Sequence, residues 1–470
     1  MDQSSLQGTQ TQDHTDWVVA FNHFKNLIGT ASVDLKVQYI IKLSHLLNRV
    51  PESILVSTVP ILVNLLDTSS TNDTLLKATV YCLKRLSCEG EGRLASIIGR
   101  SAAIHRILCL LPQSDVCLQK LLLKFLRNVV AFDGTNRVNV ARIGGLKVII
   151  DMLNSSSCPN SLRTLLLDIL SALSLLREVR RSVYNLRAVS LLIESAKVGK
   201  LASRTRAAQA IGLLGLVKRA RRDLVNFGAI EALVDLLTNG DVSTKIVAGN
   251  ALGVLSSHID YIRPVAEHGV IPLYAQLLQE QAPLAKEIAE DVFCILAVFD
   301  SNSVTIVEHL VTIMRGNDNE NIAAAADVLW DLSSYNHVLP FIHSSGVITI
   351  SLELLRSSND TNVREKVSGA IAQLCYNEAE RVVISESDGI SILINMLEDE
   401  SEEVKDNAAQ ALVYFYEDPL LCDRTTAVHN HPSFVRMKER MWHTRGAELR
   451  LAASVRQMTL DELTWNPALV

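Results

Sequence analysis

The clearest pattern of apolar and polar positions lies in residues 227–257, which read FGAIEALVDLLTNGDVSTKIVAGNALGVLSS. Apolar residues recur at helical spacing between positions 230 and 237 and again between positions 246 and 255. The polar residues 239–241, with Gly240 at their centre, interrupt the pattern between the two runs. The pattern predicts a helix, a glycine-containing turn and a second helix that carries small residues.

This pattern recurs along the chain with a period of about 41 residues, which is typical of helical repeat proteins. One position of the second helix aligns nine times, at Tyr81, Lys124, Asp168, Gln209, Asn250, Asp291, Asp327, Gly369 and Gln410. A second column holds Gly145, Gly228, Gly269, Gly346 and Gly389, where we expect a turn that requires a backbone without a Cβ atom. Ala188 fills this column once, and the repeat near Thr305 lacks several residues of its first helix.

Composition supports an all-α protein. Of the 470 residues 48% are apolar, and proline, glycine and aromatic residues are scarce, which favours helices packed on helices. No linker divides residues 50–418, so we expect one continuous array of repeats there. Residues 1–16 are polar and predict a disordered tail, residues 17–49 predict an N-terminal helical cap, and residues 419–470 predict a basic C-terminal helical cap or tail.

Charge, cysteine usage and hydropathy bear on location. The formal net charge of -6 is small for this length and does not indicate a nucleic-acid partner. Eight cysteines without paired spacing suit a reducing compartment. The sequence shows neither a signal peptide nor a transmembrane segment, and we therefore expect a cytoplasmic or nuclear protein.

Motifs that carry chemistry are absent from the sequence. None of the patterns GxGxxG, GxxxxGK[ST], HExxH, GxSxG or CxxC occurs, so we expect no enzyme, no catalytic residues, no cofactor and no metal. Cys82, Cys294 and Cys375 fall on inward-facing helices, where a core thiol is a better interpretation than a nucleophile. Trp330 is interpreted as packing or exposed groove surface.

The segments GAIEALVDLLTNGDVSTKIVAGNALGVLS and DGISILINMLEDESEEVKDNAAQALVYF resemble armadillo repeats, the three-helix units of beta-catenin and importin alpha. The style is similar to plant and fungal armadillo proteins without a U-box, and the resemblance covers about residues 50–418. It implies a right-handed α-α superhelix of about nine three-helix repeats, whose third helices line a concave groove.

In importin alpha, the third helices carry a tryptophan and, four residues later, an asparagine, which together grip an extended basic peptide. Here the tryptophan column is the series from Tyr81 to Gln410, and it contains no tryptophan. The asparagine column matches only at Asn128. The resemblance therefore does not imply a nuclear-import receptor.

The candidate groove residues share one helical face, because positions four apart lie above one another. They are basic toward the N-terminus at Lys77, Arg85, Lys120 and Lys124, acidic toward the C-terminus at Glu287, Asp291, Asp327, Asp331, Glu365 and Asp406, and uncharged at Asn128, Asn250 and Gln373. Between the charged ends we expect a largely apolar stretch. One interpretation is a protein or peptide ligand of split charge along the groove, and the alternative is a set of solvated faces without a ligand.

A second candidate is the basic patch Lys218, Arg219, Arg221 and Arg222, which we expect in a loop between repeats. It could attract an acidic or phosphorylated partner or anionic lipid, or serve as a nuclear-localisation signal. The alternative is a solvated ridge. Without interleaved aromatic residues, the patch does not indicate nucleic-acid binding.

The basic tail after residue 418 has two interpretations. It could cover the acidic last repeat as a cap, or act as a detachable partner-binding or autoinhibitory segment. For the whole chain we expect a non-enzymatic scaffold that binds protein partners. The alternative is a substrate-recognition or adaptor component associated with a ubiquitin ligase, without a catalytic domain of its own.

Overall fold

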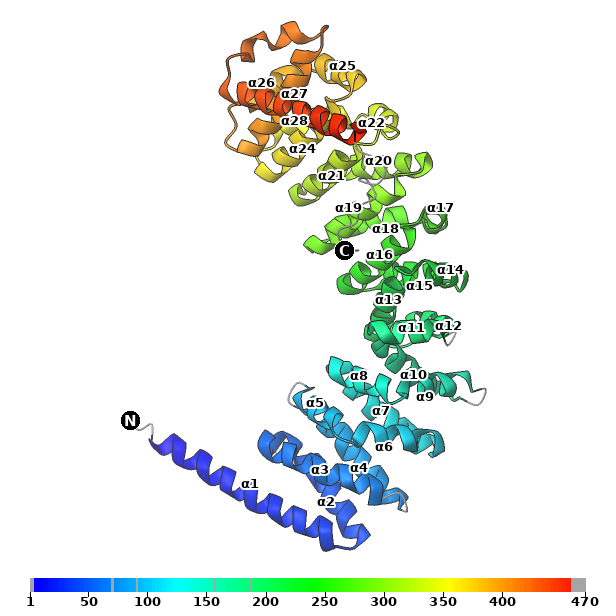
Figure 1. Cartoon of the computed structure of the whole chain (residues 1–470). Helices are drawn as coiled ribbons and strands as arrows, with labels where there is room; N and C mark the ends of the chain where they lie inside the picture. Colours follow the sequence, from blue (N-terminus) through cyan, green and yellow to red (C-terminus); the bar gives the residue numbers. More distant parts are fainter. Residues whose placement is uncertain (1–3, 69–71, 90–91, 156–157, 186–187, 458–470) are drawn as a thin grey trace. The chain divides into compact units, whose positions relative to one another are not determined.

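The computed structural model describes residues 4–68, 72–89, 92–155, 158–185 and 188–457. Every regular element in these ranges is a helix, so the predicted all-α class is confirmed (Figure 1). The chain forms two compact units, unit 1 (Met1–Leu255) and unit 2 (Ser256–Val470), and each is described by itself.

Unit 1 opens with four helices and continues with groups of three. The opening helices are α1 (Ser4–Thr30), α2 (Val33–Leu46), α3 (Glu52–Thr68) and α4 (Asp73–Leu86), with the 3-10 turn η1 (Leu47–Arg49). The groups are α5 (Arg93–Arg100), α6 (Ala103–Leu110) and α7 (Val116–Phe132), with η3 (Leu111–Gln113); α8 (Gly134–Arg142), α9 (Gly145–Asn154) and α10 (Asn160–Leu173); α11 (Arg177–Asn185), α12 (Val189–Lys197) and α13 (Leu201–Gly215); and α14 (Lys218–Asn226), α15 (Ala229–Asn239) and α16 (Val242–Ser256).

Unit 2 repeats the arrangement with one variation. Its groups are α17 (Ile259–Glu267), α18 (Val270–Leu278) and α19 (Pro283–Leu296); α20 (Asp300–Met314) and α21 (Asn319–Leu332); α22 (Leu339–Ser345), α23 (Val347–Ser357) and α24 (Thr361–Leu374); and α25 (Glu378–Glu386), α26 (Gly389–Met396) and α27 (Glu402–Glu417). The 3-10 helix η4 (Cys422–Val428) and α28 (Pro432–Gln457) follow. The single helix α20 stands where the other groups have two.

We call α4, α7, α10, α13, α16, α19, α21, α24 and α27 the third helices. Each of the nine aligned positions, from Tyr81 to Gln410, lies in a different third helix, and this confirms the repeat register. Within each unit neighbouring third helices pack on one another, as α4 does on α7 and α21 on α24. The surface that they leave uncovered is called the third-helix face below.

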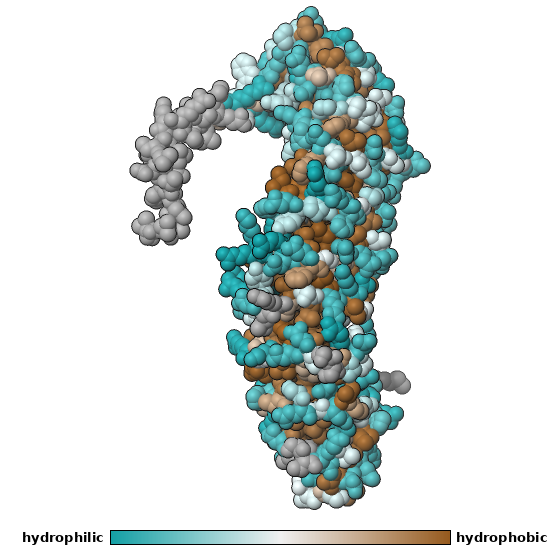
Figure 2. Space-filling view, turned by 90° about the vertical axis from the view of Figure 1, so that its right-hand side faces the viewer, coloured by the Kyte–Doolittle hydropathy of each residue, from teal (hydrophilic) through white to brown (hydrophobic). Residues whose placement is uncertain are grey.

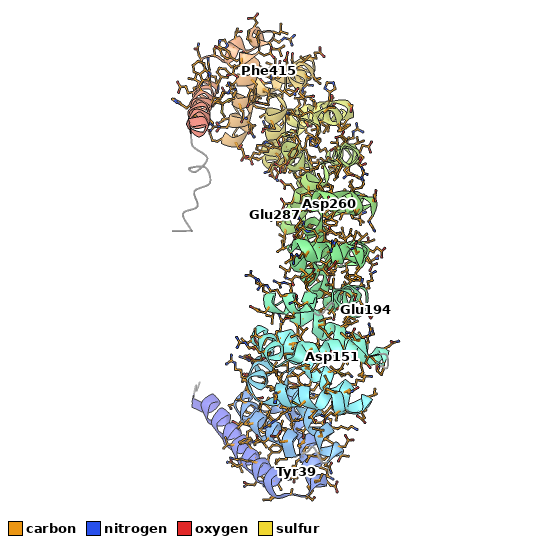
Figure 3. All side chains as sticks on the ribbon, turned by 45° about the vertical axis from the view of Figure 1, so that its right-hand side comes forward. Tyr39, Asp151, Glu194, Asp260, Glu287 and Phe415 are labelled. Atoms are coloured by element: carbon orange, nitrogen blue, oxygen red, sulfur yellow. The ribbon has the colours of Figure 1, made fainter. Side chains whose placement is uncertain are left out.

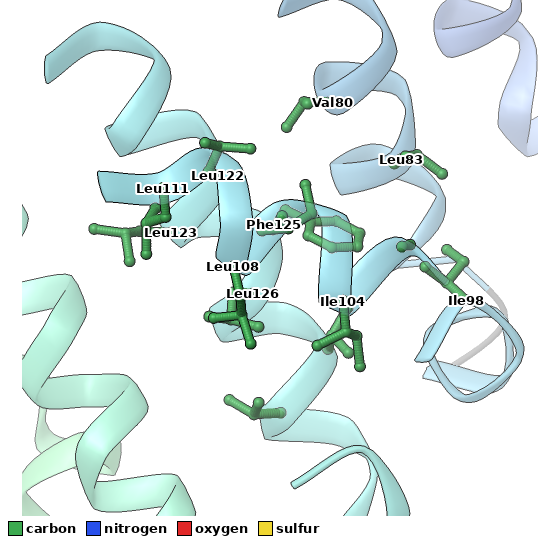
Figure 4. Packing of buried hydrophobic residues seen from close by; sticks show 14 of the residues in the cluster. Val80, Leu83, Ile98, Ile104, Leu108, Leu111, Leu122, Leu123, Phe125 and Leu126 are labelled. Atoms are coloured by element: carbon green, nitrogen blue, oxygen red, sulfur yellow. The ribbon is translucent and has the colours of Figure 1, made fainter. Parts of the chain in front are cut away.

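The core is made between helices of successive groups. Leu83 of α4, Ile98 of α5, and Phe125 and Leu126 of α7 have no exposed surface, and they belong to one cluster of buried residues with Ile104 of α6 (Figure 4). A group of two or three short helices cannot bury its own apolar side chains, so its stability depends on its neighbours.

Capping residues mark where several third helices begin. The side chains of Asn72, Asp115, Asp318, Asp360 and Ser401 each accept a hydrogen bond from the backbone N–H three residues later. Such caps satisfy N–H groups that the helix itself leaves unpaired, and each is worth about 1 kcal/mol. The turn residues of the sequence therefore set the start of these helices.

The predicted glycine turns hold at three positions and differ at two. Gly228, Gly269 and Gly346 take left-handed φ angles of 85°, 70° and 75° directly before α15, α18 and α23. Before α9 and α26, however, the left-handed residues are Gly144 and Asp388. The predicted residues Gly145 and Gly389 follow them and lie inside the helices. Space requires glycine there, because a Cβ on Gly145 would lie 2.7 Å, and a Cβ on Gly389 2.6 Å, from a backbone oxygen of the preceding helix.

The ends of the chain differ in part from the expectation. Helix α1 begins at Ser4, so the backbone is helical over most of the range where the sequence predicts a disordered tail, and residues 1–3 lie outside the description. Trp17, Phe21 and Phe24 of α1 line a hollow of about 270 Å³ against α2 and α3. Residues 458–470 of the predicted C-terminal segment also lie outside the description.

Among the described residues, no single helix has the length and apolar character to cross a bilayer. Only the pair 93–100 and 103–113, bent by 75°, meets both requirements when taken together. The apolar side chains of this pair, such as Ile98 and Ile107, are buried in the unit 1 core.

Gly369 illustrates how closely third helices approach. A Cβ at this position would lie 2.3 Å from the Trp330 ring, so Gly369→Ala forces the ring to move. Overpacking costs about 1–3 kcal/mol and the better helix propensity of alanine returns up to about 1 kcal/mol, so we expect the variant to lose about 1–2 kcal/mol in denaturant unfolding. The double variant Trp330→Leu/Gly369→Ala should lose less than the sum of the two single variants. Strict additivity would contradict this packing.

Candidate binding faces on the third helices

Apolar side chains on the face in Figure 2 form separate patches among polar ones rather than one continuous band. Charge is therefore the more informative property of the surface.

The four predicted basic residues of unit 1 have different surroundings. Lys77 Nζ lies 2.5 Å from Asp73 Oδ2 and 3.4 Å from Asp115 Oδ2, and the hydrogen bond to Asp73 raises its pKa. Lys120 is exposed, while Arg85 and Lys124 are half-buried. Among the described residues these three form no ion pair. Three of the four predicted cations are thus available to a ligand.

Asn128 is not available to a ligand, contrary to the prediction. Its side chain is buried, and Nδ2 donates to Ser87 Oγ at 3.3 Å and lies 3.0 Å from Cys88 Sγ. These contacts tie α7 to the end of α4. Asn250, in contrast, is exposed on α16.

A buried ion pair that the sequence analysis missed lies in the middle of the unit 1 face. Asp168 of α10 is 8% exposed and binds Arg206 of α13, while Arg127 of α7 lies 3.8 Å from its other oxygen. Three successive third helices are thereby joined, and this stretch is not as apolar as predicted. Arg127 and Arg206 lie three positions from Lys124 and Gln209 of the aligned series. Charges at these neighbouring positions of the repeat were the sequence signal for the ion pair.

The basic patch differs from the prediction in two respects. Residues 218–222 lie in helix α14 and not in a loop. Arg221 is buried, and its Nε donates to the Gly215 carbonyl at 2.8 Å, so it holds α14 on the end of α13. Lys218, Arg219 and Arg222 are exposed.

The acidic residues of unit 2 come together on α19 and α21. Glu287 and Asp291 of α19 and Asp331 of α21 are exposed, and Asp327 is half-buried (Figure 3 labels Glu287). The structure adds Glu290, which is half-buried among them and outside the aligned columns. Glu287, Glu290, Asp291, Asp327 and Asp331 are called the acidic face below.

Burial dominates the electrostatics of the acidic face. It raises the pKa of Glu290 to about 8, with further increases from the charge of Asp327 and from the hydrogen bond with Asp331. Lys366 of α24 is a neighbouring cation, and its Nζ lies 3.0 Å from Asp327 Oδ2 and 5.8 Å from the centre of the Trp330 ring. Burial lowers the pKa of Lys366, but its hydrogen bond and charge interaction with Asp327 outweigh this and raise it.

The remaining predicted residues of unit 2 lie nearer the C-terminus. Glu365 accepts a hydrogen bond of 2.6 Å from Ser401 Oγ, and Gln373 is half-buried. Asp406 lies 3.1 Å from both Arg436 and Arg440 of α28. Asp406 is therefore already occupied by the chain's own basic helix.

Helix α28 packs along α27 through charge and apolar contacts. Arg445 pairs with Glu417 at 2.7 Å, and Lys438 lies 3.9 Å above the ring of Tyr416. Phe434 and Met437 are buried on the same side. A basic segment thus lies on the acidic last repeat, as the charge pattern predicts.

The cysteines carry no sign of activation. Burial raises the pKa of Cys82 and of Cys294 to about 12, and the charge of Asp331 contributes at Cys294. Burial also raises the pKa of Cys375. Such pKa values keep these thiols protonated at neutral pH. Cys82 and Cys375 are buried core residues, as interpreted from the sequence, whereas Cys294 is only half-buried and lies 3.9 Å from Asp331 Oδ2. Within the described ranges, no three His, Cys, Asp or Glu side chains gather as a metal site.

Comparison with known proteins supports the fold class. The HEAT repeat model matches residues 390–418. None of the curated proteins matches the chain. A crystal structure of an engineered protein, Northeast Structural Genomics Consortium target OR497, is similar with a TM-score of 0.64 and 20% identity, covering 84% of this chain and 98% of that one.

A second similar structure belongs to work on a phosphorylation switch that controls the interaction between cadherin and beta-catenin. Its TM-score is 0.55 at 17% identity, and the match covers 76% of this chain and 68% of that one. Likenesses at this level of identity concern the fold alone. Together these matches place the chain in the class of helical repeat solenoids.

The raised pKa of Glu290 makes unit 2 sensitive to pH. The unfolded chain releases the Glu290 proton near pH 4.5 and the folded chain releases it near pH 8. The stabilisation of the folded state that comes from protonated Glu290 is therefore fully present below pH 4.5 and is lost as the pH rises through about 8. Glu290→Gln keeps an uncharged side chain, and at pH 8 we expect its calorimetric unfolding temperature to exceed that of the native chain by about 2 °C or more. Glu287→Gln, on the exposed side of the same helix, is the matched control. An unchanged pH profile in Glu290→Gln would refute the assignment.

Proposed function

We propose that this chain is a non-enzymatic protein-interaction scaffold of the armadillo type, and that the acidic face of unit 2 binds a basic segment of a partner protein. The observation that carries the proposal is the charge of this face. Five carboxyl groups gather on α19 and α21, and Lys366 of α24 pairs with one of them, Asp327.

The chain's own helix α28 supports the kind of ligand proposed. Its arginines bind Asp406 and Glu417 on α27, within the same unit. The acidic face on α19 and α21 offers the same chemical groups, and in the part of the chain that the structure describes no arginine is ion-paired with them. Guanidinium groups suit carboxylates because they donate two parallel hydrogen bonds, so an arginine-containing segment fits best.

The partial burial of Glu290 makes binding at the acidic face depend on pH. Exposed ion pairs contribute between zero and about 1 kcal/mol each, so Glu287 and Asp291 alone would bind weakly. Glu290 is half-buried and holds a proton near neutral pH, and a cation beside it favours the ionised form. Binding of a basic segment is then coupled to proton release, and its affinity rises with pH up to about 8.

The basic residues of unit 1 define a separate face, for which we propose an acidic segment as ligand. Arg85, Lys120 and Lys124 on α4 and α7 carry this proposal. The exposed patch residues Lys218, Arg219 and Arg222 lie on α14 and are a second basic surface of the same unit. The sequence suggests one ligand that carries both charges, and we propose instead a separate ligand for each unit.

Charge reversal tests the acidic face. We expect Glu287→Lys/Asp291→Lys to weaken binding of a fluorescent arginine- and lysine-rich 12-residue peptide about tenfold or more, because close charge pairs are lost and repulsion is added. Fluorescence anisotropy at pH 7.5 measures the dissociation constant.

The matched control carries the same charge change on other helices of unit 2. Glu308 of α20 and Glu353 of α23 are exposed, and Glu308→Lys/Glu353→Lys should change the affinity less than about twofold because screening weakens distant charges. Equal loss in both double variants would mean that only net charge matters, and the acidic face would then be no binding site.

For α28 we propose the cap interpretation. Phe434 is 1% exposed while Trp442, on the same helix, is 66% exposed. Phe434→Ala should destabilise unit 2 by about 3 kcal/mol, and Trp442→Ala should have little effect. If Phe434→Ala instead leaves unfolding unchanged and strengthens binding of the basic peptide, α28 is a detachable inhibitory segment and not a cap.

An adaptor role for a ubiquitin ligase would use the same faces, and co-purification of E2 or cullin components with the tagged chain would favour it. We also propose a cytoplasmic or nuclear location. The free state of all eight cysteines supports a reducing compartment.

A further inference from the structure

A hollow of about 410 Å³ lies between α11 and α14 in unit 1. Arg177, Arg181 and Tyr184 of α11 line it on one side, and Leu213 of α13 and Val217 lie on the other. Leu213 occupies the third-helix position where an importin-type repeat would have asparagine. The hollow therefore adjoins the third-helix face of α13.

One wall of the hollow is strongly basic. Arg177 and Arg181 are four residues apart on α11, so they share one side of the helix, and both are exposed. Within the described residues neither is ion-paired. The nearest acid along the helix is Glu178, which is itself exposed and adjacent to Arg177. Two guanidinium groups thus face solvent with their charges largely uncompensated.

A third arginine fixes this wall in place. Arg180 Nη1 donates to the Leu175 carbonyl at 2.6 Å, which anchors α11 to the end of α10. Burial lowers the pKa of Arg180, and the charge of Arg177 lowers it further. The charge of Glu178 acts in the opposite direction and offsets these like charges in part.

The opposite wall is apolar and open to solvent. Leu216 is 64% and Val217 51% exposed, so apolar surface is accessible beside the hollow. Exposed Lys218, Arg219 and Arg222 of α14 follow directly. Asp223 opposes them in part, since one of its oxygens lies 3.9 Å from Arg222 Nε.

We propose that this hollow binds a phosphorylated segment of a partner protein. The phosphate lies between Arg177 and Arg181, because a dianion with three acceptor oxygens matches two guanidinium groups better than a single carboxylate does. An apolar side chain of the same segment rests on Leu213, Leu216 and Val217. This site is in unit 1 and goes beyond the function proposed for the acidic face.

The shape of the site favours a peptide over a membrane. A lipid surface requires basic and apolar groups that project together from a convex face. Here the apolar residues line a hollow between two helices, of a size that suits one or two side chains. Anionic vesicles are therefore an arm of the test and not the proposal.

The probe is a fluorescent 10-residue peptide with one phosphoserine two positions from a leucine, and its comparison peptides carry serine or glutamate at the phosphorylated position. With the full chain, we expect the phosphopeptide to bind about tenfold or more tightly than either comparison peptide. Arg177→Ser/Arg181→Ser should remove this preference. Leu216→Ser should keep the preference for phosphate and lose the preference for leucine.

The matched control is Arg142→Ser/Lys147→Ser, which removes two exposed cations from α8 and α9 of the same unit. It should leave phosphopeptide binding unchanged, and equal thermal unfolding of all variants shows that they fold. Three results would overturn the proposal: equal binding of the glutamate and phosphoserine peptides, unchanged binding in Arg177→Ser/Arg181→Ser, or Arg177- and Arg181-dependent binding of phosphatidylserine vesicles without phosphopeptide binding. The acidic face of unit 2 is untouched by these variants, so its test stays independent.

Discussion

Contact between neighbouring third helices is the interaction on which the rest of the molecule depends. The side chains that fill the core, such as Leu83 of α4 and Phe125 of α7, come from helices that belong to successive groups. Since burial of apolar surface supplies most of the stability, no group is stable without its neighbour. This constraint explains why small residues recur at close approaches: Gly369 accepts the Trp330 ring, and Gly212 lies against the backbone of Ala251.

The same stacking brings charges from distant parts of the sequence together. Asp168 meets Arg127 and Arg206 because α7, α10 and α13 are successive third helices. Glu290 meets Asp327 and Asp331 for the same reason. In the first case opposite charges join the repeats. In the second, burial and the neighbouring like charges together raise the pKa of Glu290. A solenoid can thus place a structural ion pair and a binding face on equivalent helices.

The sequence predicted the fold closely because periodic patterns depend on local geometry. The column from Tyr81 to Gln410 located all nine third helices. The pattern could not show which polar side chains are buried. Asn128 of the groove and Arg221 of the basic patch were therefore predicted to bind a ligand, although their side chains hold helices together. Glu290 and Arg206 were missed because they lie one and three positions from the column. Which side of a helix faces its neighbour depends on packing between groups, and a single column does not contain that information.

Helix α28 also has a consequence for assembly between molecules. An array of stacked repeats has an apolar end that fits the apolar beginning of another array, and unprotected copies can join head to tail into filaments. In unit 2 the last repeat is covered, because Phe434 and Met437 are buried and the arginines of α28 pair with Asp406 and Glu417 of α27. The surface on which a further repeat would stack is therefore occupied by the chain's own helix.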